Sequence, residues 1–102
     1  MAIKKQFLKS KPLCKVTFAV PATVVEGASK VAVVGEFNQW DASAHVLKKQ
    51  KTGEFKATIE LPVEQEVQFR YVVDDQTWLN DEEADKWVPN GFASEQNSVL
   101  VL

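Results

Sequence analysis

Alternating apolar and polar residues predict three strands of this chain. The clearest segment is residues 54–61, where apolar side chains take every second position and charged or hydroxyl side chains take most of the positions between them. The same period of two runs through residues 14–20 and 67–73. This period is typical of β-strands with one face in a core and the other in water. In residues 67–73 it turns Arg70 away from the core.

Two further segments are apolar at almost every position. Residues 31–34 read VAVV and end at Gly35, so the run is too short for a helix and predicts a central strand buried on both faces. Residues 99–102 predict a final strand that is paired and buried. Weaker signals predict a lysine-protected edge strand at residues 46–49 and a short strand at residues 77–79, behind a turn.

The whole pattern predicts an all-β fold. About seven short strands separated by turns, with no convincing helix, favour an immunoglobulin-like β-sandwich. Pro12 predicts a loose N-terminal arm over residues 1–12 before a single domain over residues 13–102. The polar segment 80–97 contains Pro89 and Gly91, which exclude regular structure over much of its length. The residues predicted to fill the core are Val16, Phe18, Val33, Phe55, Ile59, Phe69, Tyr71 and Val99.

The composition narrows the function classes. With 102 residues, 12 basic and 14 acidic side chains and a net charge of −2, the chain does not show the basic character of a nucleic-acid binder. Cys14 is the only cysteine, so it cannot form an internal disulfide. No apolar secretory region follows the first lysines, and no apolar run reaches membrane length. We therefore expect a cytoplasmic protein that binds neither nucleic acid nor a membrane.

The residues after the strand at 31–35 favour a ligand with both polar groups and apolar faces. Phe37 suits a core, whereas Asn38, Gln39 and Trp40 combine amide donors and acceptors with a large flat ring where the strand ends. A pyranose fits such a set, because its axial C–H groups can lie on an indole while its hydroxyls pair with amides.

Three motifs, in order along the chain, resemble one known family. GEFNQWD at residues 35–41 resembles the glycogen-binding and isoamylase-type early-set modules, the carbohydrate-binding modules of family 48. These modules occur in branching and debranching enzymes and in the β-subunit of AMP-activated kinase. QFRYVVDDQTW at residues 68–78 resembles the family's second motif, and residues 88–102 resemble the closing segment of its bacterial members. The resemblance implies an early-set sandwich that binds α-glucans.

The resemblance also implies a set of sugar-binding residues. These are Trp40, Arg70, Trp78 and Asn97, with Asn38 as a further candidate. The two tryptophans match ring-stacking positions, Arg70 stands where the family usually has a lysine, and Asn97 matches a sugar-contacting asparagine. Each residue also has an ordinary structural interpretation. A tryptophan can belong to the core, Arg70 can be an exposed charge paired with Glu60 or a neighbour, and Asn97 can serve a turn.

The sequence departs from the family pattern in two places. The turn before Trp78 is one residue longer than the common turn. Residues 92–95 match poorly the apolar residue and the threonine with which the kinase β-subunit clasps its glucan. Trp87 is predicted to pack against the sandwich.

The sequence gives little support for a catalytic or metal-binding function. His45 is the only histidine, so we expect neither a metal cluster nor a Ser–His or Cys–His nucleophile system. The acidic residues 81–85 lack EF-hand spacing and predict a solvated loop. The paired carboxylates of a glycosidase need a cleft, which so small a sandwich does not obviously offer. The family's enzymes carry their chemistry in a separate barrel of about 250 residues. We expect no enzyme activity, no cofactor and no metal.

Two functions follow from the sequence. The first is non-catalytic binding of α-1,4-glucans (glycogen, starch or maltooligosaccharides) by stacking on surface tryptophans. The second is a protein-interaction or scaffold domain with a degenerate sugar site, which would accompany a glycogen-metabolising enzyme of the glycoside hydrolase family 13 type.

Overall fold

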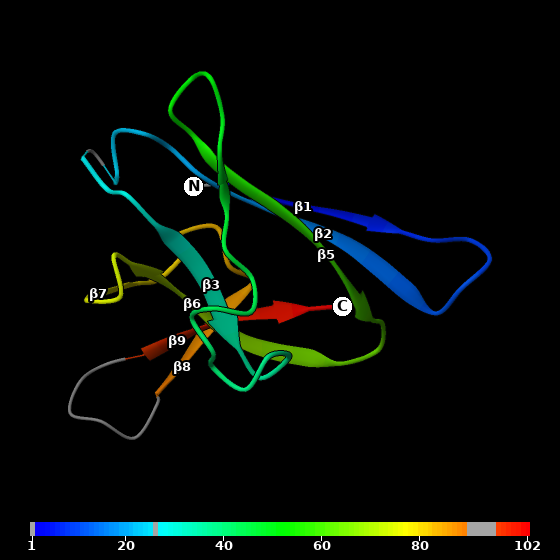
Figure 1. Cartoon of the computed structure of the whole chain (residues 1–102). Helices are drawn as coiled ribbons and strands as arrows, with labels where there is room; N and C mark the ends of the chain where they lie inside the picture. The colour runs from blue at the N-terminus through cyan, green and yellow to red at the C-terminus, as the bar shows by residue number, and fades with distance from the viewer. Residues whose placement is uncertain (1, 26, 90–95) are drawn as a thin grey trace.

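The computed structural model describes residues 2–25, 27–89 and 96–102 and shows an all-β sandwich (Figure 1). Two antiparallel sheets pack against each other. The strands of the described residues are β1 (Ala2–Phe7), β2 (Leu13–Val20), β3 (Val31–Gly35), β4 (Lys48–Lys49), β5 (Phe55–Pro62), β6 (Glu66–Val73), β7 (Thr77–Leu79), β8 (Lys86–Pro89) and β9 (Gln96–Val101). The described part of the chain has no helix long and apolar enough to cross a membrane.

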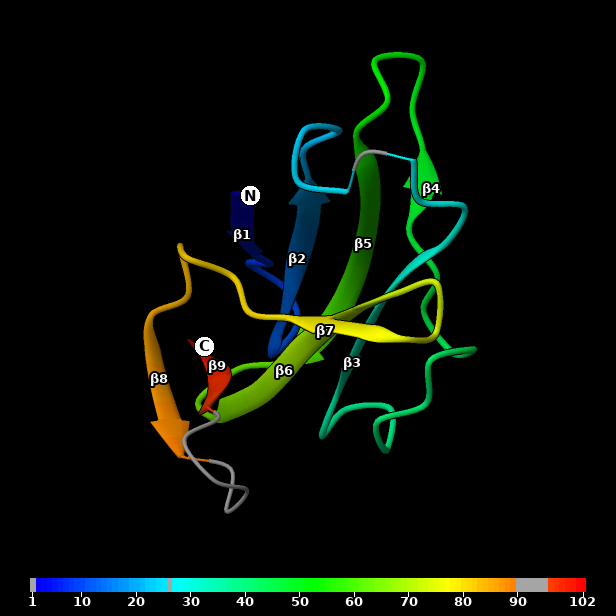
Figure 2. The ribbon, with the colours of Figure 1, turned by 90° about the vertical axis from the view of Figure 1, so that its left-hand side faces the viewer.

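The first sheet has the strand order β1-β2-β5-β4, and Figure 2 shows β1, β2 and β5 side by side. The register of β2 and β5 places Val16 opposite Ile59 on the inner face. On the outer face it places Thr17 opposite Thr58. The predicted alternation of residues 54–61 is therefore confirmed, because apolar side chains that share a parity all point to one side.

The second sheet is built around β6. Its strand order is β3-β6-β9-β8, and β7 also pairs with β6. β3 runs along one side of β6, while β9 and β7 follow one another along the other side. This arrangement follows from the register, since Phe69 pairs with both Gly35 and Ser98, and Tyr71 pairs with both Val33 and Leu79.

Aromatic rings fill the space between the sheets. The Phe18 ring lies 5.3 Å from that of Phe69 and 6.2 Å from that of Tyr71, and Phe37 stacks on it at 6.4 Å. All eight residues predicted for the core are buried. Val99 differs from the rest in direction, because it pairs with Gln68 on the outer face of β6, and its neighbour Leu100 enters the core.

The prediction of a central strand at residues 31–35 is partly wrong. Every residue of β3 is buried, as expected for a strand covered on both faces. However, β3 stands at the end of the strand order, and in the described part of the chain its other side is paired with just the short segment 45–47. In this segment the His45 carbonyl accepts a hydrogen bond from Val33 N, and Leu47 N donates one to the Val31 carbonyl. A strand that is buried on both faces can therefore still stand at the end of a sheet.

Two segments expected to be irregular form strands. Residues 2–7 pair with β2 along their whole length, so a loose arm is wrong for this part of residues 1–12. Lys5 also crosses between the sheets to the Asp85 carboxylate and the Val101 carbonyl. Within the polar segment 80–97, residues 86–89 form β8 at the edge of the second sheet. Pro89 ends this edge strand, a position where its missing N–H can be tolerated.

Candidate functional site

The outer face of the second sheet brings together residues from four separate segments. The register pairs Val34 with Arg70, Val72 with Trp78, and Gln68 with Val99. Residues that pair directly project from the same face of a sheet. We call this surface the Trp78 face; it comprises Val34, Gln68, Arg70, Val72, Trp78, Asn97 and Val99.

Arg70 and Trp78 are in direct contact on this face. The guanidinium carbon lies 5.5 Å from the centre of the indole ring, and Nη2 donates to the Trp78 carbonyl at 3.5 Å. Arg70 is only 9% exposed, whereas Trp78 is 44% exposed. The guanidinium thus supports a ring that remains open to solvent. Arg70 does not pair with Glu60, because Glu60 lies opposite Lys15 in the β2–β5 register, on the outer face of the other sheet.

Asn97 lies on the same face, at the start of β9. Its Nδ2 donates to Gln68 Oε1 at 3.0 Å, and its side chain is buried. Gln68 precedes Arg70 by two residues, so the two side chains project in the same direction from β6. The predicted residues Arg70, Trp78 and Asn97 therefore form one cluster. The sequence analysis did not name Gln68, although its position two residues before Arg70 in the same strand predicts that it lies on the Trp78 face.

The longer turn before Trp78 does not displace this residue from the face. Asp74 and Asp75 have positive φ angles of 51° and 58°, and Gln76 N donates to the Val73 carbonyl at 3.0 Å. The Asp74 carboxylate accepts from the backbone N–H groups of Ser29 and Lys30. Aspartates tolerate the left-handed region better than most residues and often accept local backbone bonds. Held in this way, the turn leaves Trp78 opposite Val72.

Trp40 belongs to a tight loop that follows β3. The Gly35 carbonyl accepts from the N–H groups of Asn38 and Trp40, and Gln39 and Trp40 have positive φ angles of 58° and 60°. Trp40 is half-buried, so it is not a fully buried core residue. Gly35 pairs with Phe69, and a Cβ at Gly35 would lie 2.4 Å from the Gln68 carbonyl oxygen, which explains the glycine.

Trp40 and Trp78 arise on opposite sides of β6. Gly35, where the Trp40 loop begins, lies opposite Phe69, whereas Trp78 lies opposite Val72. At about 3.4 Å per residue, these levels are about 10 Å apart along β6. The role of Trp40 as a second stacking ring remains a prediction.

Asn38 has a structural role within that loop. Its Oδ1 accepts from Gly35 N at 3.0 Å, and its Nδ2 donates to the Val33 carbonyl at 3.0 Å. Nδ2 also lies 2.9 Å from Nδ1 of His45, whose ring packs on Phe37. These bonds occupy the amide on both sides, so Asn38 holds the loop that presents Trp40. Its predicted contact with sugar is untested.

The acidic segment 81–85 is more than the solvated loop that its composition predicts. Asp81 is fully buried and accepts from the Tyr71 hydroxyl at 2.7 Å and from Glu83 N at 2.8 Å. Its carbonyl accepts from Nε1 of Trp87 at 3.2 Å. Burial, reinforced by the Asp81 carboxylate, raises the pKa of Tyr71 far above its ordinary value. Asp81 therefore anchors this loop beneath the sheet.

Trp87 offers a natural comparison for Trp78. It is 42% exposed, close to the 44% of Trp78. However, Trp87 pairs with Ser98, and Ser98 pairs with the inward-pointing Phe69, so Trp87 projects from the inner face of the second sheet. Its hydrogen bond to Asp81 ties the ring to the edge of the sheet. The two exposed indoles consequently belong to opposite faces of the second sheet.

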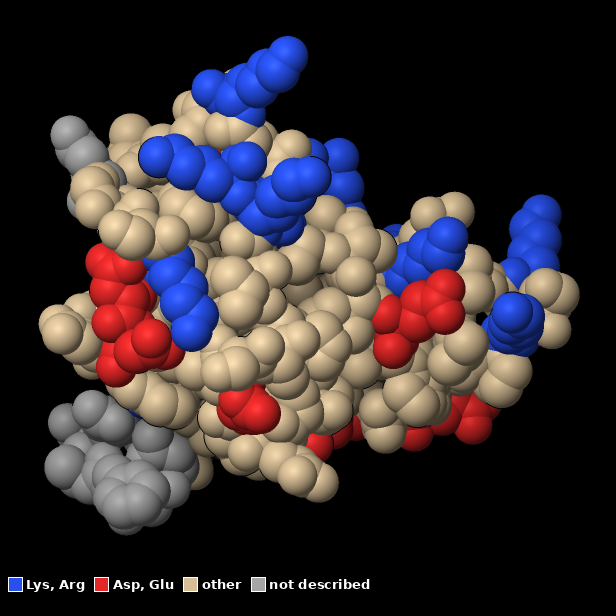
Figure 3. Space-filling model, viewed as in Figure 1, with Lys and Arg blue, Asp and Glu red and all other residues tan. Residues whose placement is uncertain are grey.

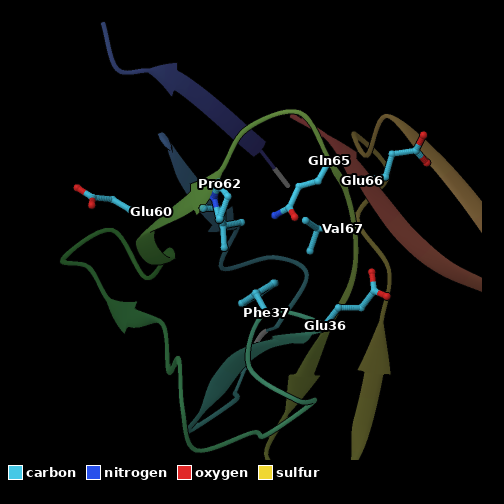
Figure 4. A pocket seen from close by; sticks show the side chains of 8 residues that line it. Glu36, Phe37, Glu60, Pro62, Gln65, Glu66 and Val67 are labelled. Atoms are coloured by element: carbon cyan, nitrogen blue, oxygen red, sulfur yellow. The ribbon is translucent and has the colours of Figure 1, made fainter. Parts of the chain in front are cut away.

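A hollow of about 490 Å³ opens at one end of the sandwich, contrary to the expectation of no obvious cleft (Figure 4). Its lining is Glu36, Phe37, Glu60, Leu61, Pro62, Gln65, Glu66 and Val67. Glu36 Oε1 accepts from Gln68 N at 2.8 Å, and Glu66 pairs with Lys86 at 2.6 Å.

The described residues contain no group of three or more His, Cys, Asp or Glu side chains arranged to hold a metal ion. Residues 92–95, where the sequence departs from the family's clasping loop, lie outside the described residues.

Comparison with known proteins identifies the family. Residues 20–101 match the family model described as the glycogen recognition site of AMP-activated protein kinase. This range contains the whole of the Trp78 face and the Trp40 loop. No curated protein sequence matches the chain significantly.

Proposed function

Since the chain belongs to the family of the glycogen recognition site of AMP-activated protein kinase, a family of carbohydrate-binding modules, we propose that it binds α-1,4-glucans without chemically altering them. Glycogen, starch and maltooligosaccharides are the ligands of this class. The observation that carries the proposal is the exposed Trp78 ring supported by Arg70 on an outer sheet face. A flat ring with one supported side and one open side suits the apolar face of a glucose unit.

In this proposal each residue has a distinct role. Trp78 and Trp40 stack on glucose rings, and Asn97 and Arg70 form hydrogen bonds with hydroxyls through amide and guanidinium groups. Asn38 acts mainly by holding the Trp40 loop. The α-1,4 linkage suits two rings at different levels of the sheet, because such chains curve, whereas β-1,4 chains are flat ribbons.

The affinity should be weak. An open platform encloses little of its ligand, so we expect a Kd of about 0.1–1 mM, equivalent to roughly −4 to −5.5 kcal/mol. Weak binding by one module suits a polymer, because several contacts along the same glucan add through effective concentration.

The test is a titration with maltoheptaose followed by amide chemical shifts. We expect shifts at Arg70, Trp78 and Asn97 and at the Trp40 loop, and no saturable response to cellohexaose. Trp78→Ala should abolish the response. An aromatic contact contributes about 0.5–1.5 kcal/mol to the binding free energy beyond the area it buries, and losing it raises a Kd near 1 mM beyond the detectable range.

Trp87→Ala is the matched control, since it removes an equally exposed indole from the other face. It should leave maltoheptaose binding unchanged. If the wild-type protein gives no response at 10 mM ligand, taken as about ten times the expected Kd, the glucan proposal is wrong and the role of an interaction domain for a glycogen-metabolising enzyme takes its place.

A further inference from the structure

Gln68 occupies the junction between two parts of the proposed glucan site. Its Oε1 accepts from Nδ2 of Asn97 at 3.0 Å. Its backbone N–H donates to Glu36 Oε1 at 2.8 Å, and its carbonyl accepts from Glu36 N at 3.1 Å. Glu36 follows β3 directly and begins the loop that leads to Trp40. One residue of β6 is thus bonded both to Asn97 on β9 and to the base of the Trp40 loop.

The bond to Asn97 determines how that amide is presented. A side-chain amide carries an acceptor on one side and two donors on the other, and rotation about its terminal bond exchanges them. Because Gln68 offers an oxygen, the Asn97 nitrogen is the atom that faces it. The direction of the Asn97 carbonyl oxygen is thereby defined before any ligand binds.

Preorganisation of this kind favours binding, since the ligand need not select one orientation of the side chain from several. We propose that Gln68 is a positioning residue of the glucan site, which acts through Asn97 and sets the direction in which the Asn97 amide meets a sugar hydroxyl. This inference rests on the proposed function of the Trp78 face.

The residue type at position 68 matters for this role. A methionine would match the length of Gln68 but would offer no comparable acceptor to Asn97. A glutamate would still accept the bond. However, it would place a carboxylate beside Arg70, two positions along the same face, and would compete with Trp78 for the guanidinium.

The experiment is a double-mutant cycle on the intact chain, with the Kd for maltoheptaose as the readout. Gln68→Met should weaken binding about three- to tenfold, in line with the release of one ordered side chain. In an Asn97→Ala background the same substitution should change the Kd less than twofold, because Gln68 then has no amide to orient. Gln6→Met, an exposed change on β1 in the other sheet, is the control and should have no effect.

Two further readouts separate positioning from general damage. In the ligand-free Gln68→Met variant, the NMR chemical shifts of the Asn97 side-chain NH2 group should change. The unfolding midpoint of this variant should stay near that of Gln6→Met. Gln68→Glu still offers an acceptor and should retain the Asn97 signals; if these signals are lost in Gln68→Glu, the inference is overturned even where Gln68→Met does not fold. Equal effects of Gln68→Met in both backgrounds, or wild-type affinity in this variant, would overturn the inference while leaving glucan binding intact. A wild-type protein that does not bind maltoheptaose would instead refute the proposed function, and the inference with it.

Discussion

The two outer faces of the sandwich follow the same alternation but have different chemistry. On the first sheet, the outward positions of the described strands are mainly charged, amide or hydroxyl side chains: Lys4, Gln6, Lys15, Thr17, Lys48, Lys56, Thr58 and Glu60. On the Trp78 face, an open indole and two buried polar groups, Arg70 and Asn97, lie among buried valines. The first face is polar and mostly exposed, whereas the second is amphipathic.

Charge is also divided between the sheets, which the net charge of −2 conceals. Residues 2–20 and 48–61 hold most of the lysines, whereas Glu54 and Glu60 are their only carboxylates. Figure 3 shows lysine side chains gathered over the β4–β5 hairpin and the β1–β2 turn. The chain therefore has a basic face that its balanced composition did not predict. Binding a sugar calls for fixed donors beside an apolar surface, and among the described strands the second sheet combines them.

Removing the ring that both faces depend on should have the largest effect. Phe69 lies between Gln68 and Arg70 in β6, points into the core and contacts Phe18 and Tyr71. Phe69→Ala should reduce the free energy of unfolding by about 3–5 kcal/mol through lost burial and a cavity. Chemical denaturation measures this loss. A loss below 1 kcal/mol would mean that the two sheets are not joined through this ring.

Asp81 should matter to the second sheet far more than its acidic neighbours do. Asp81→Ala leaves the buried Tyr71 hydroxyl and the Glu83 N–H without their acceptor, so we expect a loss of about 2–3 kcal/mol. Asp75→Asn is the control, since it removes the exposed ion pair with Lys30 while asparagine still tolerates the positive φ angle of this position, and it should cost less than about 1 kcal/mol. Equal losses in urea unfolding would contradict the anchoring role of Asp81.

The contrast between the faces can be tested with two changes of basic residues. Arg70→Lys replaces a planar group that covers the Trp78 ring with a compact ammonium. We expect maltoheptaose binding to weaken about two- to fivefold, equivalent to a cation–π contribution of about 0.5–1 kcal/mol. Lys56→Gln on the other face should leave the Kd unchanged. Calorimetry that finds the two variants equally impaired would remove the distinction between the faces.

The smallest effect concerns the edge where the sheets are linked. Burial disfavours the Asp85 carboxylate, but hydrogen bonds from Lys5 and Val101 N outweigh it and lower the pKa of Asp85. A lowered pKa contributes stability above the unfolded value, about 3.9, and loses it as the pH falls through the folded pKa. Because this pair is partly exposed, the contribution should be about 0.5 kcal/mol or less. Asp85→Asn should accordingly flatten the pH dependence of stability between about pH 5 and pH 2 by that amount.

Much of the fold could be predicted from local pattern, because a strand with one buried face must repeat every two residues. Segments that lack this signal were misjudged. In β1, adjacent lysines interrupt the alternation, and β8 contains Pro89, so neither reads as a strand until its pairing partner is known. Asp81 resembles its solvated neighbours in sequence, and only its contact with Tyr71 distinguishes it.

The sequence by itself determined the inward positions of the strands with clear alternation, that Arg70 points outward, and to which family the motifs belong. The tertiary structure alone decided that Arg70 contacts the Trp78 ring, that Asn97 is hydrogen-bonded to Gln68, and that Trp87 lies on the opposite face. The physical reason is range. The direction of a side chain follows from its position within its own strand, whereas neighbours on a sheet surface depend on pairing between segments far apart in the chain, which local periodicity does not encode.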